Sequence, residues 1–317
     1  MNLQFSIIIP VYNRPDEVDE LLESLTKLNG GYSFEVVIVE DGSMHTCELI
    51  IKKYSSELDI KYFLTENQGA GKSRNYGMQK ASGNYFIIFD SDCLIPENYL
   101  LAVHGNLEKK YTDAFGGPDA AHKNFTNIQK AINYSMTSFF TTGGIRGKKK
   151  AVGKFQPRSF NFGLSKKAYE KTQGFSDLKI GEDIDLTFRL WENKFETQLI
   201  DSAFVYHKRR TSFRQFFKQT NNFGKARPIL NRNYPGTANI TYWFPSLFLL
   251  GIVVAILAAG FNFYVGICLY IFYFLVLFVD ATIQNKSIVV GLLSVCSSSV
   301  QFYGYGTGFL KSFFYKK

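Results

Sequence analysis

The stretch that decides the fold is Tyr85-Phe-Ile-Ile-Phe-Asp-Ser-Asp92, in which five apolar residues lead directly into two carboxylates. Apolar runs without polar alternation are typical of strands that are covered on both faces of a sheet. Three similar runs and three segments with helical spacing alternate along the first 90 residues. The strands are expected at 5–9, 35–39, 60–64 and 85–89, and the helices at 16–28, 47–54 and 73–81. This alternation predicts an α/β fold with a mostly parallel sheet and helices on both faces.

Acidic groups follow two of these expected strands. Glu40-Asp-Gly-Ser43 follows the second strand, and Asp90 and Asp92 follow the fourth. In such folds ligands bind beyond the carboxyl ends of the strands. The spacing of Asp90 and Asp92 points both carboxylates in the same direction, which is costly unless a cation or donors compensate. Their oxygens suit Mg²⁺ or Mn²⁺. An Asp-rich turn that caps the next helix is the structural alternative.

A second acidic cluster, Gly181-Glu-Asp-Ile-Asp-Leu186, introduces another expected helix. Acids in a first helical turn favour the helix dipole, so part of this cluster is expected to be structural. Arg189 lies four residues after Asp185 and is placed to pair with it. That pairing leaves Asp183 as the carboxylate available to a substrate.

The composition and the charges narrow the class of protein. Of the 317 residues, 46% are hydrophobic and 20% charged, which excludes a disordered chain. The four cysteines are far apart and are expected to be reduced packing residues. No acid lies between Asp201 and Asp280, and the first part of this gap is strongly basic. Because apolar segments follow directly, the basic run predicts contact with an anionic membrane surface and no nucleic-acid partner.

Long apolar stretches occupy the C-terminal part, at about residues 243–259 and 263–281. Each is close to the ~20 residues that a helix needs to cross a membrane. A third, at 288–309, is richer in serine and glycine. We expect it to span as well, and a re-entrant or interfacial segment is the alternative. The basic residues upstream predict a multi-pass protein of the inner (cytoplasmic) membrane with a cytoplasmic catalytic domain.

Residues 213–240 combine basic residues with phenylalanines at helical spacing, a pattern typical of a helix at the membrane interface. A helix packed on the globular domain is the alternative. Pro228 and Pro235 are expected to break the chain before the first apolar stretch.

Five motifs together resemble the family 2 glycosyltransferases, whose nucleotide-sugar-binding domain has the GT-A fold. They are Ile-Ile-Ile-Pro-Val-Tyr-Asn-Arg (7–14), Val-Ile-Val-Glu-Asp-Gly-Ser (37–43), Asn-Gln-Gly-Ala-Gly-Lys-Ser-Arg-Asn-Tyr-Gly (67–77), Asp-Ser-Asp (90–92) and Gly-Glu-Asp-Ile-Asp-Leu-Thr-Phe-Arg-Leu (181–190). The resemblance covers roughly residues 5–212. It implies a GT-A domain at 1–212, followed by the basic segment 213–240 and a membrane region at 241–317.

The resemblance also implies roles for individual residues. Asp183 matches the catalytic base, and Asn161 and Glu182 match the substrate pocket. The nucleotide-binding positions are Pro10, Tyr12, Arg14, Asp41, Arg74 and Asp90, and the ligands of a Mg²⁺ or Mn²⁺ ion are Asp92, Asp90 and His207. Glu40 departs from the aspartate that is frequent in the family. The implied reaction transfers a sugar, with inversion, from a UDP- or GDP-linked donor to a lipid-linked or cell-envelope glycan acceptor.

Two other functions are compatible with parts of the sequence. A processive polysaccharide synthase is less well supported, because the chain has few C-terminal spans and lacks a Gln-x-x-Arg-Trp motif after the catalytic region. A non-catalytic membrane-anchored binding protein is the other alternative, and the intact Asp92 and Asp183 argue against it.

Overall fold

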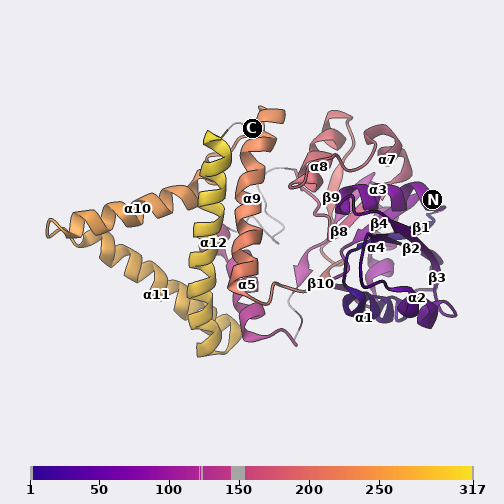
Figure 1. Cartoon of the computed structure of the whole chain (residues 1–317), viewed down its shortest axis with the longest axis horizontal. Coiled ribbons are helices and arrows are strands. Elements are labelled where there is room, and N and C mark those ends of the chain that lie inside the picture. Colours follow the sequence, from indigo (N-terminus) through magenta and orange to yellow (C-terminus); the bar gives the residue numbers. More distant parts are fainter. Residues whose placement is uncertain (1–2, 121, 123, 144–153, 316–317) are drawn as a thin grey trace. The chain divides into compact units, whose positions relative to one another are not determined.

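The computed structural model describes residues 3–120, 122, 124–143 and 154–315. The chain forms two compact units, one from residues 1–122 and 149–207 and the other from 123–148 and 208–317. The first is an α/β unit and the described part of the second is helical (Figure 1). The predicted fold class is thereby confirmed.

A seven-stranded sheet in the order β3-β2-β1-β4-β8-β6-β9 forms the centre of the α/β unit. The first four of these strands are parallel, β8 is antiparallel to β4 and β6, and β9 is parallel to β6. The strands are β1 (Phe5–Val11), β2 (Phe34–Asp41), β3 (Asp59–Thr65), β4 (Tyr85–Phe89), β6 (Ala114–Gly116), β8 (Asn161–Ser165) and β9 (Thr197–Leu199).

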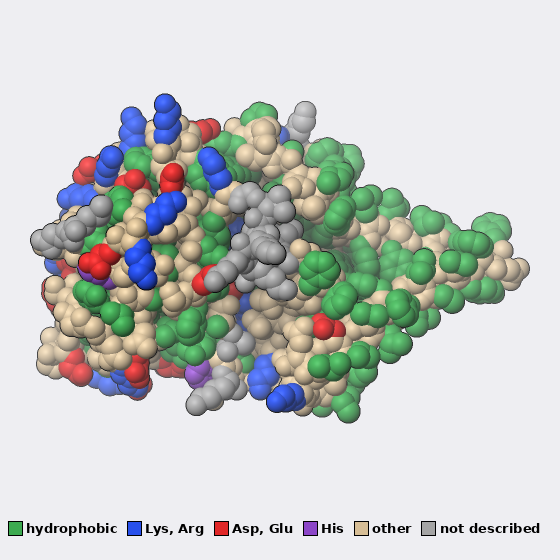
Figure 2. Space-filling view, turned by 180° about the vertical axis from the view of Figure 1, so that it is seen from behind, with side chains coloured by type: hydrophobic (Ala, Val, Ile, Leu, Met, Phe, Trp, Pro, Cys, Tyr) green, Lys and Arg blue, Asp and Glu red, His purple; other side chains and the backbone are tan. Residues whose placement is uncertain are grey.

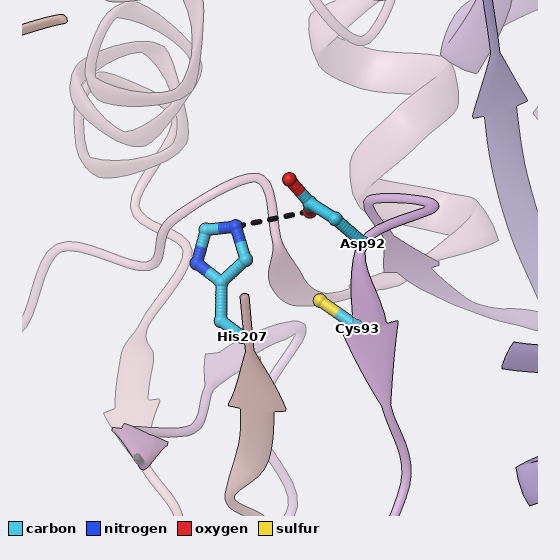
Figure 3. A group of neighbouring side chains, drawn as sticks. All are labelled: Asp92, Cys93 and His207. Carbon is cyan, nitrogen blue, oxygen red and sulfur yellow. Dashed lines mark ion pairs between the residues drawn. The ribbon is translucent and has the colours of Figure 1, made fainter. Parts of the chain in front are cut away.

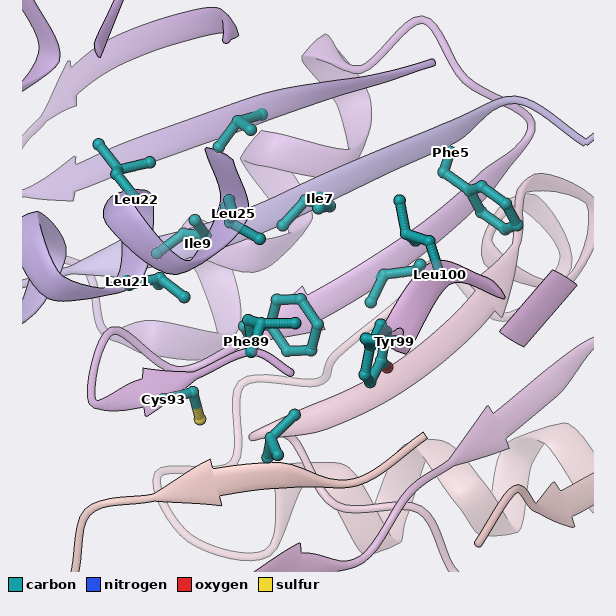
Figure 4. Packing of buried hydrophobic residues seen from close by; sticks show 14 of the residues in the cluster. Phe5, Ile7, Ile9, Leu21, Leu22, Leu25, Phe89, Cys93, Tyr99 and Leu100 are labelled. Carbon is teal, nitrogen blue, oxygen red and sulfur yellow. The ribbon is translucent and has the colours of Figure 1, made fainter. Parts of the chain in front are cut away.

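Alternate residues of the central strands pack on opposite faces, since successive side chains of a strand point in opposite directions. Ile7 and Ile9 join the cluster that contains Leu21 and Leu100, part of which is drawn in Figure 4. Ile8 joins the cluster on the other face. The covering helices are α1 (Pro15–Thr26), α2 (Glu48–Tyr54) and α4 (Tyr99–Lys109) for the first face, and α3 (Ala70–Lys80), α7 (Lys166–Thr172) and α8 (Glu182–Glu192) for the second.

The α/β unit also contains a small three-stranded sheet, whose first strand follows β4 in the sequence. Its strands are β5 (Cys93–Leu94), β10 (Val205–His207) and β7 (Asp119–Ala120), in the order β5-β10-β7. β5 and β10 are antiparallel, with His207 opposite Cys93. This pairing places His207, the last residue of the α/β unit, next to Cys93 and therefore close to Asp92.

The helical unit consists of α5 (Asn127–Thr137), α6 (Phe139–Thr142), α9 (Phe213–Asn233), a 3₁₀ turn (Ile240–Trp243), α10 (Phe244–Ala259), α11 (Val265–Asn285) and α12 (Ile288–Phe314). Among the described residues, the helices at Ile240–Ala259, Val265–Asn285 and Ile288–Phe314 are long and apolar enough to cross a membrane. Hydrophobic side chains cover most of the visible surface of α10 and α11 (Figure 2).

The expectation that Pro228 breaks the chain is wrong, because α9 continues through it to Asn233. Proline removes one backbone donor and strains the preceding turn. Here Pro228 and Leu230 are both buried, and α9 packs along α12, with Gly224 against the backbone of Tyr305 and Phe309. This packing outweighs the loss of one helical hydrogen bond.

The packing of α3 on the sheet predicts opposite effects for the same substitution at two helical glycines. A Cβ at Gly77 would lie 2.7 Å from the Ile8 Cγ2, whereas a Cβ at Gly105 in α4 would meet nothing within 4 Å. We expect Gly77→Ala to lower the free energy of unfolding by about 1–3 kcal/mol through overpacking. Gly105→Ala should raise it by up to about 1 kcal/mol through helix propensity. Denaturant unfolding of the detergent-solubilised chain measures both, and equal effects would contradict the packing described.

Candidate active site

The buried guanidinium of Arg74 joins the two acidic clusters of the sequence. Arg74 lies on α3 and is 3% exposed. Its Nη2 donates to Asp90 Oδ1 at 2.7 Å, and its Nη1 donates to Glu182 Oε1 at 3.1 Å. The ring of Phe175 lies beneath the guanidinium, 5.1 Å from its central carbon. The carboxyl end of β4 and the first turn of α8 therefore meet at one positively charged side chain, that of Arg74.

Burial and charge act against each other in this group. Burial raises the pKa of Glu182 because it disfavours the charged carboxylate; Arg74 opposes this rise and Asp183 adds to it. Burial alone would lower the pKa of Arg74, but Asp90 and Glu182 raise it above its usual value. Arg74 is consequently a permanent positive charge, and Asp90 and Glu182 depend on it for compensation.

Asp92 lies beside this cluster and faces a histidine from the far end of the unit (Figure 3). His207 Nε2 lies 3.1 Å from Asp92 Oδ1, and Arg14 Nη1 lies 3.5 Å from Asp92 Oδ2. The imidazole of His207 stacks on the ring of Phe160, at 4.6 Å between centroids. Asp92 is buried, so both of its oxygens are held in defined directions.

The residues around Asp92 fit a divalent cation. Ligand atoms of Asp92, His207 and Cys93 lie within 4.8 Å of one another. Carboxylates suit Mg²⁺ and Mn²⁺, and an imidazole suits transition-metal ions, so a divalent ion fits this pair. Cys93 is the weakest of the three donors, because burial raises the pKa of its thiol and its sulfur donates to the carbonyl of Phe160 at 3.5 Å. Asp92 and His207 are the pair that fits.

Asp183 occupies the first turn of α8, next to Glu182. Its Oδ1 accepts the N–H of Ile184 at 2.8 Å, and Arg158 Nη1 lies 3.8 Å from its Oδ2. Asp185 turns away to Arg189, whose Nε donates to Asp185 Oδ2 at 2.9 Å. The spacing argument for that pair agrees with the structure, and Asp183 is the more accessible of the two carboxylates.

The backbone that follows β2 is held by its own side chains. Both oxygens of Asp41 accept backbone N–H groups, from Gln68 at 2.8 Å and Gly69 at 2.9 Å. Asp41 is buried, and its hydrogen bonds order the loop that leads into α3, the helix that carries Arg74. Gly42, at φ +71°, packs against Asn67 so closely that a Cβ would lie 2.6 Å from its backbone nitrogen. Asp41 therefore has a structural role, whatever further contact it makes.

Glu40 points into the protein. It is fully buried, and its Oε2 accepts the N–H of Cys47 and the hydroxyl of Tyr62, both at 2.9 Å. The longer side chain that departs from the frequent aspartate thus binds the connection to α2 and a residue of β3. It makes no direct contact with the Arg74 cluster among the hydrogen bonds described.

The three residues predicted at the end of β1 and just after it differ in burial and in their contacts. Pro10 is buried in the sheet opposite Val39, and Tyr12 is 51% exposed. Arg14 reaches Asp92 and also donates to Glu17 at 2.6 Å. Of the residues predicted at this end, the structure brings Arg14 directly to an acidic residue of the site.

Asn161 is fully buried and begins β8 opposite Phe89, the last residue of β4. Its amide oxygen accepts the hydroxyl of Tyr99 at 2.5 Å, and its amide nitrogen donates to the carbonyl of Ala203 at 2.8 Å. Both ends of the side chain are therefore used inside the protein. Asn161 fixes the start of β8, which Arg158 and Phe160 directly precede.

Sequence reasoning missed Arg158 and Phe160. They approach Asp183 and His207 respectively, but their sequence neighbourhood shows no charge pair or helical spacing that would single them out. Their position just before β8 was the feature that could have identified them, because β8 is antiparallel to β4 and therefore begins beside the end of β4.

The Arg74 cluster predicts a pH-dependent loss of stability on substitution. Arg74→Met should lower the free energy of unfolding by about 3–5 kcal/mol, because it leaves buried carboxylates uncompensated. The loss should be smaller at pH 5 than at pH 8, since protonated carboxyls need no counter-charge and the pKa of Glu182 is already raised. Arg74→Lys, which keeps the charge but not the two-armed geometry, is the control and should lose less. A pH-independent loss would contradict the assignment.

Comparison with known proteins identifies the family. Residues 6–172 match the sequence profile of glycosyl transferase family 2. A stretch of 114 residues is 33% identical to the poly(ribitol-phosphate) beta-N-acetylglucosaminyltransferase TarS of Staphylococcus aureus, covering 35% of this chain and 20% of TarS. A stretch of 245 residues is 27% identical to the chondroitin synthase of Pasteurella multocida, covering 65% of this chain and 25% of that protein. The chain thus matches only a minor part of these relatives.

Two solved structures share the fold. The mannosyltransferase PcManGT of Pyrobaculum calidifontis, in complex with GDP-Man and Mn²⁺, aligns with a TM-score of 0.65 at 14% identity, covering 94% of this chain and 87% of its own. Staphylococcus aureus TarS in complex with UDP-GlcNAc aligns at 0.51 with 20% identity, covering 98% and 91%. The α/β unit has the GT-A fold, and the chain belongs to glycosyl transferase family 2.

Proposed function

We propose that this glycosyltransferase moves a sugar, with inversion, from a UDP- or GDP-linked donor to a lipid-linked or cell-envelope glycan acceptor at the cytoplasmic face of a membrane. The observation that carries the proposal is the meeting of Asp90 and Glu182 on Arg74, which gathers Asp92 and Asp183 into the same region. Carboxylates from stretches of chain about 90 residues apart are concentrated at the carboxyl end of the sheet, where ligands of open α/β folds bind.

The donor class is supported by the relatives. TarS has been crystallised with UDP-GlcNAc and PcManGT with GDP-Man, so both pyrimidine and purine nucleotides are found on this fold. Glu40 faces away from the Arg74 cluster, toward Tyr62, and so does not discriminate between a UDP-linked and a GDP-linked donor.

Asp92 and His207 are the residues proposed to hold a Mg²⁺ or Mn²⁺ ion, with Asp90 beside them. A divalent cation there supplies Lewis-acid stabilisation for the negative charge of a departing nucleoside diphosphate. Arg14 approaches the other oxygen of Asp92 and adds a second positive charge to the same region. The chain thereby concentrates positive charge where the diphosphate is proposed to lie.

Asp183 is proposed as the general base that accepts the proton of the acceptor hydroxyl. The N–H of Ile184 donates to its Oδ1, and Arg158 lies 3.8 Å from its Oδ2. These contacts hold the carboxylate in a defined position at the start of α8. A single base and a single displacement give inversion at the anomeric carbon.

The membrane location is supported by the helical unit. Three described helices are apolar enough to span a bilayer, and α9 carries Arg214, Lys218, Lys225, Arg227 and Arg232. Basic residues next to apolar segments favour the cytoplasmic side, where anionic lipids are abundant. An acceptor embedded in that membrane would be within reach of an enzyme anchored there.

The general-base role predicts that Asp183→Asn lowers sugar transfer by roughly 10²–10⁴-fold. Donor binding should change little, because the amide keeps the size and the contact with Ile184. Transfer of radiolabel to lipid extracts and to high-molecular-weight glycan measures the activity, and calorimetry measures donor binding. Asp59→Asn alters an exposed carboxylate at the amino end of β3, and this control should retain full activity.

Unchanged transfer by Asp183→Asn would overturn the catalytic assignment. Label found in long polymers made by the purified protein alone would favour a processive synthase instead. Label found in short products or lipid would support single transfers.

The metal assignment predicts that one nucleotide sugar raises the melting temperature of the protein only when Mn²⁺ is present. Asp92→Asn should abolish that Mn²⁺-dependent rise, and His207→Ala should weaken it. His45→Ala removes an exposed histidine and is the matched control. A donor-induced rise that is equal with Mn²⁺ and with a chelator would contradict the assignment.

A further inference from the structure

We infer that α12 does not cross the membrane but lies along its surface, across the open base of an α10–α11 hairpin that dips into the lipid and returns. The inference rests on the membrane attachment proposed above. It replaces three crossings by one re-entrant hairpin, and it concerns only the helical unit. The partner is a bilayer whose surface contains anionic lipid.

The hairpin is open at its base and closed at its tip. Near the tip, Gly266 of α11 lies against Ala255 of α10, close enough that a Cβ on Gly266 would be 2.8 Å from the Cβ of Ala255. At the base, α10 and α11 separate and each meets α12 at a different place (Figure 1).

The two meeting places are at opposite parts of α12. Pro245 and Ser246, at the start of α10, lie on Gly306, whose carbonyl accepts the Ser246 hydroxyl at 3.1 Å. Thr282, near the end of α11, lies on Gly291. Gly291 and Gly306 are about 22 Å apart along a helix axis at 1.5 Å per residue. Helix α12 therefore bridges the two arms, and both of its ends lie on the side from which the hairpin leaves.

Helix α9 excludes the alternative in which α12 spans. The two helices are in close contact: Asn221 Nδ2 donates to the carbonyl of Gly304 at 3.0 Å, and Arg232 Nη1 donates to the carbonyl of Ser312 at 3.1 Å. The basic residues of α9 are spread along this contact, from Arg214 to Arg232. If α12 crossed the hydrocarbon, α9 would carry these charges into it, which is strongly unfavourable.

The polar contacts of α12 fit a position at the interface. It is buried within the protein to a much greater extent than α10 or α11. On the side of α5, the Ser297 hydroxyl donates to the carbonyl of Ala131 at 2.9 Å and contacts the hydroxyl of Ser135. The arms of the hairpin, in contrast, expose large apolar side chains to the surroundings, among them Leu257 and Phe272.

The tip of the hairpin, rather than the length of its arms, argues for a return within the lipid. Both arms are long enough to cross a membrane. The connection between them has no charged residue, and Phe261 at its tip is 86% exposed. Asp280 accepts the hydroxyl of Tyr134 at 2.6 Å, so the polar end of α11 lies at the level of α5.

Two native cysteines provide the test. Cys268 lies near the tip of the hairpin and Cys296 lies in the first half of α12; both are exposed, whereas Cys47 and Cys93 are buried. Cys296→Ser and Cys268→Ser leave one or the other for a nitrobenzoxadiazole probe. Each labelled protein is placed in phosphatidylcholine–phosphatidylglycerol vesicles that contain lipids with a nitroxide either near the headgroup or near the chain end.

The probe on Cys268 should be quenched best by the deep nitroxide, and the probe on Cys296 by the shallow one. The opposite preference at either cysteine overturns the inference, because a spanning α12 places Cys296 in the hydrocarbon and a crossing hairpin brings Cys268 close to the far surface.

Sidedness provides an independent measurement. In the Cys268→Ser, Cys296→Ser background, Lys311→Cys in α12 and Asp177→Cys in the α/β unit should react with an impermeant maleimide from the same side of sealed vesicles. Reaction from opposite sides overturns the inference. Failure of the unlabelled protein to sediment with vesicles would instead contradict the proposed membrane attachment, so the two failures are distinguishable.

Discussion

The pairing of one buried arginine with two carboxylates is the constraint on which the α/β unit depends. Arg74 cannot lose its proton, and it is almost inaccessible to water. Its planar group meets Asp90 and Glu182 with different nitrogens, so α3, the end of β4 and the start of α8 have to converge. The remaining acidic residues of the site take their positions from this convergence, Asp92 two residues after Asp90 and Asp183 directly after Glu182.

The carboxylates near the carboxyl edge divide by their partners. Asp41 binds backbone N–H groups, Glu40 binds a backbone N–H and a tyrosine, and Asp185 binds Arg189. These groups hold loops and helices in place. Asp92 instead faces Arg14 and His207, and Asp183 faces Arg158 besides the N–H of Ile184, with side-chain distances from 3.1 to 3.8 Å. An arrangement of this kind is suited to exchange those partners for a cation or a substrate.

Much of the α/β unit was predictable because its strands are continuous apolar runs that end in acids, and burial on both faces leaves few alternatives. The position of Asp90 and Asp92 directly after β4 was predictable for the same reason, and that of Glu182 and Asp183 because acids favour the first turn of a helix. Arg158, the passage of α9 through Pro228 and the inclusion of residues 123–148 in the helical unit were not found, since each depends on contacts between distant segments. For α12 the sequence left both a span and an interfacial segment open. Its contacts with α9 and with both arms of the hairpin are the observations that favour the interfacial position.

Asp92 and Asp183 are proposed to serve one donor site. The most direct measurement is an anomalous difference map, at the manganese edge, of crystals containing Mn²⁺ and an unreactive nucleotide-sugar analogue. We expect a peak in contact with the Asp92 carboxylate, with the diphosphate of the analogue at the ion and its anomeric carbon facing Asp183. A peak remote from Asp92, or a sugar bound where Asp183 cannot reach it, would rule out a shared donor site.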